Sequence, residues 1–438
     1  MPERRDINLS IPHDFSSKSS SVSLMAVKST TENFFSRWWF VAVVGLIVSA
    51  TVIISIGIIV VIFVINSSRA TMTSTNCFTS TSSQPSNTWY LVGNMSTPRY
   101  YHTSTLISQD GSVLITGGIT ASVGLASIER YIPSTGCFQS SGSMSSVRYY
   151  HTADSMSSLS SWIIIAGGYN GVTAVGTADI YDPATESIVT IYLASAIYAH
   201  RSAIVSESQL VLIGGVNTAV VTNTGQLFSI GHPSAFTFAI NTMSVGLVWH
   251  TATPLQNTSD LVLITGGTDG VSYYATVSLY QGSSHAFISL APGVSLSTAR
   301  VYHTGTYVPY PINQVLIAGG STNSITYLNT LALFDVETLQ FVPITTTMLS
   351  PRGWHTSTIL PNGKILIIGG FDGSTSISTC ELIDPENNYA STQVASLKVA
   401  RYIHTATILS TSGNGTVLVC GGYKTGIGAL NSCEVYVV

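Results

Sequence analysis

A histidine-centred phrase recurs along the chain and sets the period on which its fold must be built. The stretch "RVYHTGTYVPYPINQVLIAGG" begins at residue 300, and close variants begin at residues 99, 148 and 352. In register, the histidines are separated by 49, 49, 50, 53, 52 and 49 residues, which makes seven units. They are His102, His151, His200, His250, His303, His355 and His404. Self-similarity at a fixed period of this length indicates a repeat architecture.

Each unit contains four strand-like runs. One run follows the histidine, and a second, rich in Val and Ile, ends in two glycines, which predicts a buried strand that stops where the backbone needs unusual dihedral angles. The pairs are Gly117-Gly118, Gly167-Gly168, Gly214-Gly215, Gly266-Gly267, Gly319-Gly320, Gly369-Gly370 and Gly421-Gly422. Turns such as "GGYNG" and "GGFDG" predict hairpins to a third run, typified by "TADIYDP". A weaker fourth run, such as "FVPITTTM", leads into the next unit.

Seven units of four antiparallel strands favour a closed ring, a seven-bladed β-propeller, because closure protects the edges of the sheets. The last unit has three runs, whereas residues 87–95, "NTWYLVGNM", have the character of a fourth run placed ahead of the first unit. We therefore expect this N-terminal strand to complete the last blade. The composition agrees with an all-β fold, since only 8% of the residues are charged while Ser, Thr, Gly, Val and Ile abound.

The glycine pair, the "YDP" or "LIDP" of the third run and the period near 50 residues resemble kelch repeats, whose family fold is a β-propeller. The resemblance covers residues 87–438, although the third and fourth units have Ile197 and Leu247 in place of the arginine. It implies that the Arg-x-x-His phrase opens the innermost strand of each blade, near one mouth of a central channel.

That placement makes the phrase a candidate ligand-binding ring at the channel mouth. Guanidinium groups suit carboxylates, so the ring predicts an anionic or sugar-like ligand. The alternative interpretation is structural: each Arg and His bonds the backbone or a neighbouring blade, which the presence of the histidine in all seven units favours. The candidates are the seven histidines with Arg99, Arg148, Arg300, Tyr302, Arg352 and Arg401. The aromatic residues beside the register are interpreted as packing between blades; they are Tyr101, Tyr150, Trp249, Tyr302 and Trp354.

The phrase "RVYHT" is also similar to a copper-binding stretch of galactose oxidase and related copper-radical oxidases, whose catalytic domain is a kelch-type propeller. Carried over, this resemblance nominates Tyr302 and His303, with Tyr101-His102 and Tyr150-His151 as competing matches. Those enzymes also need a cysteine crosslinked to a second tyrosine, and no cysteine occupies the histidine register here. Lacking compact Cys/His spacing and the common catalytic motifs, the chain is expected to have no metal or cofactor; copper is implied only by the oxidase alternative.

Residues 38–65, "WWFVAVVGLIVSATVIISIGIIVVIFVI", predict a membrane-spanning helix, because they carry no charge and are long enough to cross about 30 Å of hydrocarbon. A cleaved signal peptide fits poorly, since 37 residues precede the segment. Five basic residues lie before the span and only Arg69 in the twenty after it, so the positive-inside rule places residues 1–37 in the cytoplasm. We interpret residues 1–37 as a disordered tail and residues 66–86 as a Ser/Thr-rich stalk.

Cysteines and sequons fall on the predicted external side, where disulfides persist. The cysteines are Cys77, Cys137, Cys380, Cys420 and Cys433, and the odd number leaves at least one without an intramolecular partner. Cys420 ends one predicted strand and Cys433 begins the next, so a disulfide across these strands is one option. The sequence leaves the connectivity open. The predicted glycosylation sites are Asn94, Asn257 and Asn414.

Together these features predict a single-pass type II membrane protein that displays a recognition module outside the cell or in the secretory lumen. The module is expected to bind a protein or a glycan through its channel mouth, a step that rests on analogy with the fold. A formal net charge of −4 gives nucleic-acid binding no electrostatic support. The copper-radical oxidase is the alternative function. The predicted topology disfavours the ubiquitin-ligase adaptor role of cytosolic kelch proteins.

Overall fold

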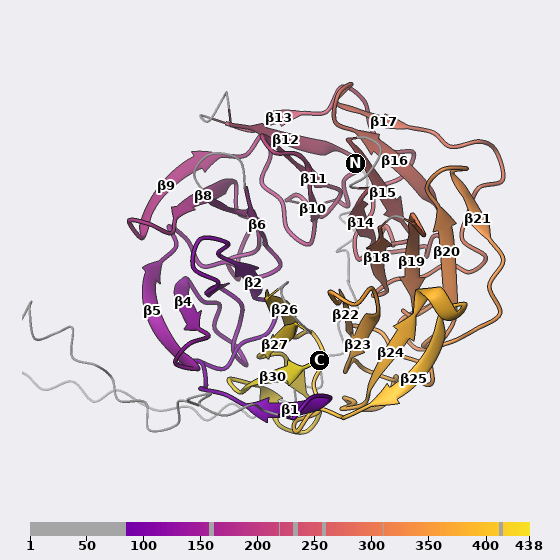
Figure 1. Cartoon of the computed structure of the whole chain (residues 1–438). Coiled ribbons are helices and arrows are strands. Elements are labelled where there is room, and N and C mark those ends of the chain that lie inside the picture. Colours follow the sequence, from indigo (N-terminus) through magenta and orange to yellow (C-terminus); the bar gives the residue numbers. More distant parts are fainter. Residues whose placement is uncertain are drawn as a thin grey trace, which may run out of the picture. The chain divides into compact units, whose positions relative to one another are not determined.

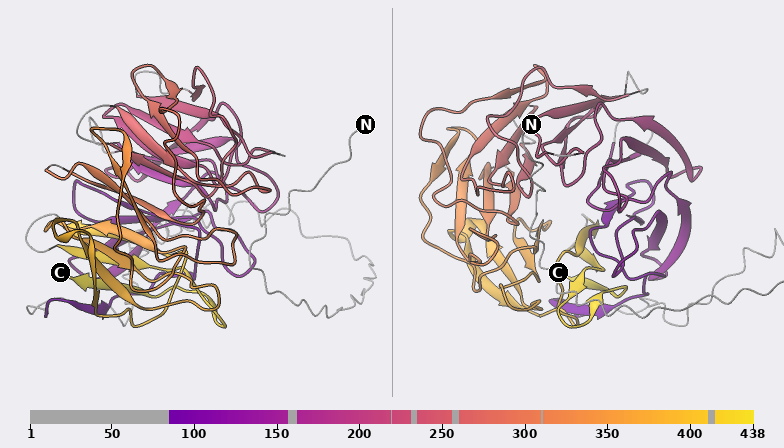
Figure 2. Two further views of the ribbon diagram at one scale, coloured as in Figure 1. Left: turned by 90° about the vertical axis from the view of Figure 1, so that its right-hand side faces the viewer. Right: turned by 180° about the vertical axis from the view of Figure 1, so that it is seen from behind.

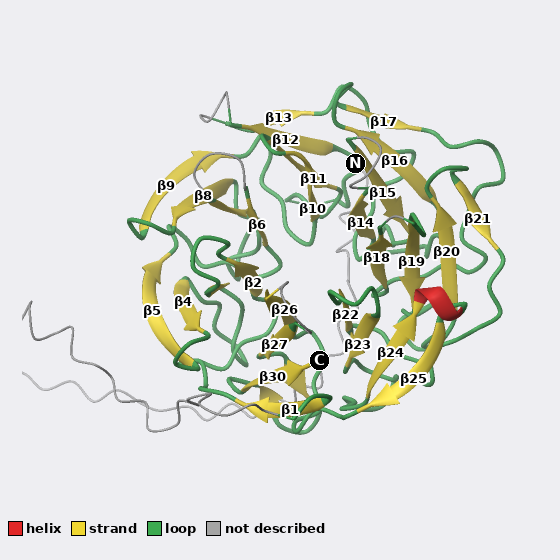
Figure 3. Ribbon diagram, in the orientation of Figure 1, coloured by secondary structure: helices red, strands yellow, loops and turns green. Residues whose placement is uncertain are grey.

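The structure is a computed structural model that describes residues 85–156, 162–218, 220–230, 235–255, 260–309, 311–410 and 415–438. Seven four-stranded antiparallel sheets form the blades of a ring (Figure 1). Figure 2 shows the same ring edge-on and from behind. The one helical element described is a single 3-10 turn, η1 (Pro385–Asn387), which Figure 3 shows in red. The expected all-β, seven-bladed fold is confirmed.

In each of the first six blades the strands run in chain order from the channel outward. Blade 1 contains β2 (Thr103–Leu106), β3 (Val113–Thr116), β4 (Ser127–Ile132) and β5 (Cys137–Ser143), and blade 2 contains β6 (Thr152–Ser155), β7 (Ile163–Ala166), β8 (Thr177–Asp182) and β9 (Ser187–Tyr192). Blade 3 contains β10 (Arg201–Ser206), β11 (Gln209–Ile213), β12 (Gly225–Ser229) and β13 (Thr237–Phe238), and blade 4 contains β14 (Thr251–Pro254), β15 (Leu261–Thr265), β16 (Val277–Gln281) and β17 (Ala286–Ile288).

The remaining blades repeat this order, except that the last one borrows its outer strand. Blade 5 contains β18 (Thr304–Val308), β19 (Gln314–Ala318), β20 (Leu331–Asp335) and β21 (Gln340–Val342), and blade 6 contains β22 (Thr356–Ile359), β23 (Ile365–Ile368), β24 (Cys380–Asp384) and β25 (Ala390–Val394). Blade 7 contains β26 (Thr405–Ser410), β27 (Thr416–Cys420), β30 (Cys433–Val437) and β1 (Thr88–Leu91). A two-stranded hairpin, β28 (Tyr423–Lys424) and β29 (Gly428–Ala429), lies between β27 and β30.

The N-terminal strand closes the ring, as the incomplete last unit predicts. Strand β1 pairs antiparallel with β30, with Thr88 opposite Val437 and Trp89 opposite Tyr436. The inner strands β2 and β26, from the first and last blades, lie against each other. The ring is therefore closed both at the channel and at the outer edge of blade 7.

The hydrophobic core lies between blades rather than inside any one of them. Seven clusters of buried apolar side chains each join two neighbouring blades around the ring. The second strand of each blade is buried on both faces, which explains its continuous apolar sequence: every residue of β7, "IIIA", is inaccessible to solvent. A blade alone therefore leaves two apolar faces exposed, and the closed ring buries them.

The glycine pair after this strand is required by the geometry. Gly319 has φ of +61° and Gly320 of +97°, a region that side chains disfavour. A Cβ on Gly319 would lie 2.5 Å from the carbonyl oxygen of Arg352 in the next blade. The pair thus allows two blades to approach closely.

Residues 38–65 lie outside the described residues, as do Cys77, Asn257 and Asn414. Within the described ranges no helix is both long and apolar enough to span a bilayer.

Candidate functional site

The five register arginines are buried within the blades, each at most 1% exposed. In blade 7, Arg401 donates from Nη1 to the carbonyl oxygens of Gly421 and Ser432, both at 2.8 Å. Its Nη2 donates to the Glu434 carboxylate at 2.9 Å. The guanidinium therefore joins the glycine pair, the third strand and an acid of its own blade, which is the role that the structural interpretation of the phrase predicts.

Four of these arginines have an acidic partner at the same place on the third strand. The ion pairs are Arg99–Glu129, Arg148–Asp179, Arg352–Glu381 and Arg401–Glu434. Arg300 has Ala332 at that position, and burial lowers its pKa to about 10. None of the five is among the residues that line the channel cavity. The arginines therefore lie away from the place where the candidate ligand ring expected them.

The register histidines link each blade to the one before it. Nε2 of His404 is hydrogen-bonded to Thr356 Oγ1 at 3.0 Å, and that of His303 to Thr265 Oγ1 at 3.0 Å. Six of the seven histidines make such a bond to a threonine of the preceding blade. Burial lowers the pKa of all seven, to about 3 in His151, His200, His250 and His355. At neutral pH these imidazoles are therefore uncharged parts of the ring.

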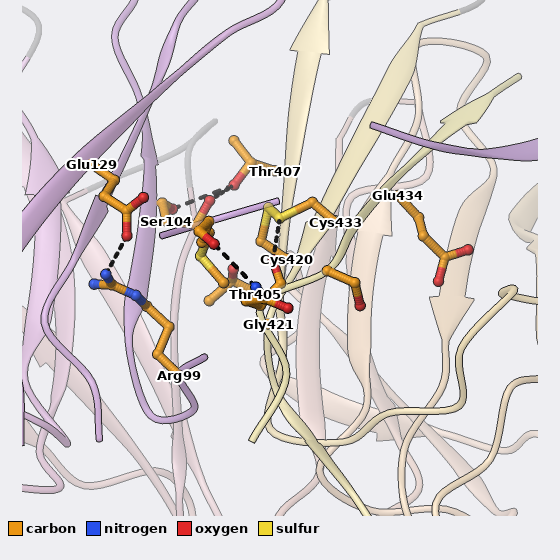
Figure 4. Close-up of a disulfide and its surroundings, with 12 residues drawn as sticks. Arg99, Ser104, Glu129, Thr405, Thr407, Cys420, Gly421, Cys433 and Glu434 are labelled. Carbon is orange, nitrogen blue, oxygen red and sulfur yellow. Dashed lines mark hydrogen bonds and ion pairs between the residues drawn. A yellow bond between two sulfur atoms is a disulfide. The ribbon is translucent and has the colours of Figure 1, made fainter. Parts of the chain in front are cut away.

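The close-up in Figure 4 shows further contacts near the place where the ring closes. Ser104 of blade 1 is hydrogen-bonded to Thr407 of blade 7 at 2.5 Å, beside the Arg99–Glu129 pair. A disulfide joins Cys420 to Cys433, which are paired across β27 and β30. The hydroxyl bond thus adds to the closure that β1 provides, and the disulfide ties together two strands within blade 7.

An aromatic plug fills the channel on the side where the inner strands begin. It consists of the side chains just before the register histidine in five blades: Tyr101, Tyr150, Trp249, Tyr302 and Trp354. Rings from blades that are not neighbours meet in it, since the Tyr101 centroid lies 5.9 Å from Trp354 and that of Trp249 lies 5.0 Å from Trp354. The mouth that the sequence suggested as an open ring of ligands is therefore closed by aromatic contacts across the axis.

All seven residues at this position have φ between +54° and +59°, including Ala199 and Ile403. Bulky side chains rarely adopt this conformation, and it costs roughly 1–2 kcal/mol per residue. Neighbouring blades compensate with backbone hydrogen bonds: Tyr302 donates to Trp249, Trp354 to Tyr302 at 3.0 Å, and Ile403 to Trp354 at 3.1 Å. Because the conformation depends on the next blade, nothing in the sequence of one unit reveals it.

Tyr302 and His303, which the oxidase resemblance nominates, both line the channel cavity but make different contacts. The ring of Tyr302 stacks on Trp354 at 3.8 Å between centroids, whereas His303 is inserted between blades and bonds Thr265. Among the described residues, no three or more His, Cys, Asp or Glu side chains are grouped to hold a metal ion. The copper-radical oxidase stays an alternative prediction.

The face around the plug bears a ring of exposed aliphatic residues, the tip ring. Its members occupy the tip of the loop that follows the glycine pair, in every blade except blade 6, which has Ser374 there. They are Val123, Val172, Val220, Val271, Ile325 and Ile427, between 53% and 87% exposed. The tip ring was not expected from the sequence, although aligning the units places an apolar residue beside each of these turns.

A second unexpected residue, Arg201, lines the channel cavity beneath the plug. It takes the place of the threonine that follows the register histidine in the other six units. The departure is visible once the seven units are aligned, as "HRS" against "HTS", "HTA" or "HTG".

The structure describes four of the five cysteines and one of the three predicted glycosylation sites. Cys380 is free and buried, which agrees with the odd number of cysteines, and Cys137 is disulfide-bonded. Asn94 is exposed.

Comparison with known proteins supports the assignment of the repeat. The family model of the kelch motif matches residues 356–389, which span β22, β23, β24 and the turn to β25 in blade 6. With the seven four-stranded blades, this match supports a kelch-repeat β-propeller. A kelch propeller in turn suggests a protein-binding module. No curated protein matched the chain.

Proposed function

We propose that the chain is a membrane-anchored recognition module whose propeller, outside the cell or in the secretory lumen, binds a partner protein through the face around the aromatic plug. The apolar residues 38–65 and the basic residues before them support the anchor and its orientation. The Cys420–Cys433 disulfide and the exposed sequon at Asn94 suit an oxidising compartment with glycosylation.

The observation that carries the proposal is the tip ring. Single exposed apolar residues are common on protein surfaces, but here they recur at one loop position in six blades, around one mouth. Isolated backbone bridges hold these loops beside the plug: Ile119 pairs with Tyr100, which precedes the plug residue Tyr101, and also with Gly124 of the loop. The aliphatic tips therefore surround the plug on one face.

The tips are also held rigidly. The Asp269 carboxylate accepts hydrogen bonds from the amides of Val271 and Ser272 at 2.8 and 2.7 Å. Asn323 does the same for Ile325 and Thr326 at 3.0 and 2.7 Å. Such turns fix the backbone before a partner arrives, which reduces the entropy lost on binding. A rigid aliphatic ring suits the apolar surface of a protein.

A glycan is less well matched by this face. Sugar sites combine stacking surfaces with polar groups that fix the orientation of the ligand. Here the plug aromatics stack on one another, with Tyr302 and Trp354 only 3.8 Å apart, and the projecting groups are aliphatic.

Site-specific photocrosslinking in cells that express the full chain tests the proposal. A photoreactive residue at Val271 or Val172 is expected to give a discrete protein adduct, whereas one at Val189, exposed on the outer strand β9, is not. Adding Ile325→Asp and Ile427→Asp is expected to remove the adduct while leaving the melting temperature within a degree or two, because both side chains are exposed.

Three results would count against the proposal. The first is an equal yield of adduct at the tip and control positions. The second is an adduct that survives the two Asp substitutions. The third is glycan binding by the intact chain that the two substitutions abolish, with no protein adduct formed. Failure of the anchor is a separate outcome, because alkaline carbonate extraction would then release the full chain from membranes.

A further inference from the structure

Arg201 departs from the repeat at a cost to the ring. In the other blades the residue after the register histidine is a threonine, and six register histidines bond a threonine of the preceding blade. His250 faces Arg201 instead, and its Nε2 has no hydrogen-bond partner among the described residues. Leaving a buried polar atom unsatisfied costs about 1–3 kcal/mol. An arginine at this position therefore leaves an imidazole nitrogen unpaired between blades 3 and 4 and calls for another explanation.

The guanidinium of Arg201 lies at a cavity of about 520 Å³ in the centre of the ring. The plug closes one end of this cavity, and its wall is made of hydroxyl and small side chains of the inner strands, such as Ser104, Ser202, Thr253 and Ser357. A volume of this size is in the range of sites for small molecules. The cavity is thus large enough for a ligand and lined with groups that bond polar molecules.

Arg201 is the one charged side chain among the described residues of this lining. The register histidines that share the cavity are neutral, because burial lowers their pKa, and the positive charge of Arg201 lowers the pKa of His200, His250 and His303 further. Nε of Arg201 donates to the carbonyl oxygen of His250 at 2.9 Å. No ion pair within 4.0 Å is formed by Arg201 with any acid in the described part of the chain.

The acid at the neighbouring position of blade 2, Asp154, does not neutralise this charge directly. Burial raises the pKa of the Asp154 carboxyl to about 6, and a hydrogen bond from Ser202 offsets part of this rise. Asp154 is not among the residues that line the cavity. A positive charge held in a closed-ended cavity without a counterion is unfavourable, and an anionic ligand relieves it.

We propose that this cavity binds a small polar monocarboxylate, of the hydroxy-acid or sugar-acid class, with its carboxylate on Arg201. The planar guanidinium matches a carboxylate with two parallel hydrogen bonds. A single guanidinium balances a single negative charge, so a dianion such as a phosphate monoester would leave charge buried. The wall hydroxyls bond the hydroxyl groups of the ligand, and the plug forms its floor. This site is separate from the tip ring, which lies on the outer side of the plug.

Substitution of Arg201 by threonine gives an unusually clear test, because Arg201→Thr restores the residue of the other six units and a partner for His250. The variant is expected to fold and to melt at a higher temperature than the wild type. The full chain in detergent micelles is titrated with glucuronate, gluconate and lactate, with glucose as the neutral control and inorganic phosphate as the dianion, by calorimetry and thermal shift.

At least one carboxylate is expected to bind the wild type about tenfold to a hundredfold more tightly than it binds Arg201→Thr. The affinity of Arg201→Lys for that carboxylate is expected to lie between the affinities of these two proteins. Glucose and phosphate are expected to show no such difference. The proposal is overturned if no carboxylate of the series distinguishes wild type from Arg201→Thr, or if phosphate binds as well as the best carboxylate. Because the comparison is with a variant that repairs the repeat, loss of binding does not arise from misfolding.

Discussion

The closing strand gives the sharpest test of how the ring is held together, and its single tryptophan is the place to apply it. Trp89 on β1 is 1% exposed, its Nε1 donates to the carbonyl oxygen of Ala395 at 2.9 Å, and its ring lies 5.0 Å from Tyr436. Replacing a buried Trp by Ala costs roughly 3–5 kcal/mol, and the carbonyl that loses its donor adds about 1 kcal/mol. Trp89→Ala is therefore expected to lower the free energy of unfolding by about 5 kcal/mol.

Urea denaturation of the full chain in a mild detergent, followed by far-ultraviolet circular dichroism, measures this change. With a denaturant slope of about 3 kcal/mol per molar, the midpoint is expected to fall by about 1.7 M. Leu91 is a matched control on the same strand, because it is 53% exposed, and Leu91→Ala is expected to move the midpoint by less than about 0.3 M. Equal shifts for the two variants would refute the argument that β1 stabilises the ring by burying Trp89.

Three further outcomes follow from the ring. Burial lowers the pKa of the register histidines, so below about pH 6.5, the ordinary pKa of histidine, the unfolded chain binds more protons than the folded one. The free energy of unfolding is therefore expected to fall as the pH drops from about 7 toward 3. Asp154, whose pKa is raised by burial, acts in the opposite sense between about pH 6 and 4. A value unchanged between pH 7 and 5 in urea titrations would contradict this. Gly319→Ala is expected to cost about 1–3 kcal/mol more than Gly363→Ala, which has positive φ but no atom within 4 Å of its new Cβ; equal melting temperatures would argue against the close approach of blades 5 and 6. Deletion of residues 86–95 is expected to abolish cooperative unfolding, and a deletion variant that melts like the wild type would disprove closure by β1.

The fold could be predicted from the sequence because the repeat is long and regular. Seven histidines and seven glycine pairs in register require seven similar units, and residues 87–95 supply the strand that the last unit lacks. The fourth strands were harder to place: "FTFAINTM" suggests a strand of eight residues, whereas β13 contains only Thr237 and Phe238. Outer strands have one sheet neighbour and little apolar burial, so their sequence pattern is weak.

The candidate site was less accessible to sequence reasoning, because spacing does not set the direction of a side chain. Arg99 and His102 lie within four residues of each other, yet the arginine bonds Glu129 inside its own blade and the histidine bonds Thr405 of blade 7. The acid partners are about 30 residues downstream on the third strand, where they look like ordinary surface charges of a β-strand. Arg201 was visible in the aligned units, but its meaning depends on a cavity that only the closed ring creates.

The backbone bonds at the plug position connect the blades head to tail in one rotational sense. Tyr150 donates to Tyr101, Ala199 to Tyr150, Tyr302 to Trp249, Trp354 to Tyr302 and Ile403 to Trp354. These bonds form two arcs, one from Tyr101 to Ala199 and one from Trp249 to Ile403, since the backbone bonds of the described residues include none between Ala199 and Trp249 or between Ile403 and Tyr101. Inside an arc, moving one blade outward stretches the bonds to both of its neighbours. Local opening of a blade inside an arc is therefore suppressed, and the amides of one arc are expected to exchange their hydrogens together, when that arc opens.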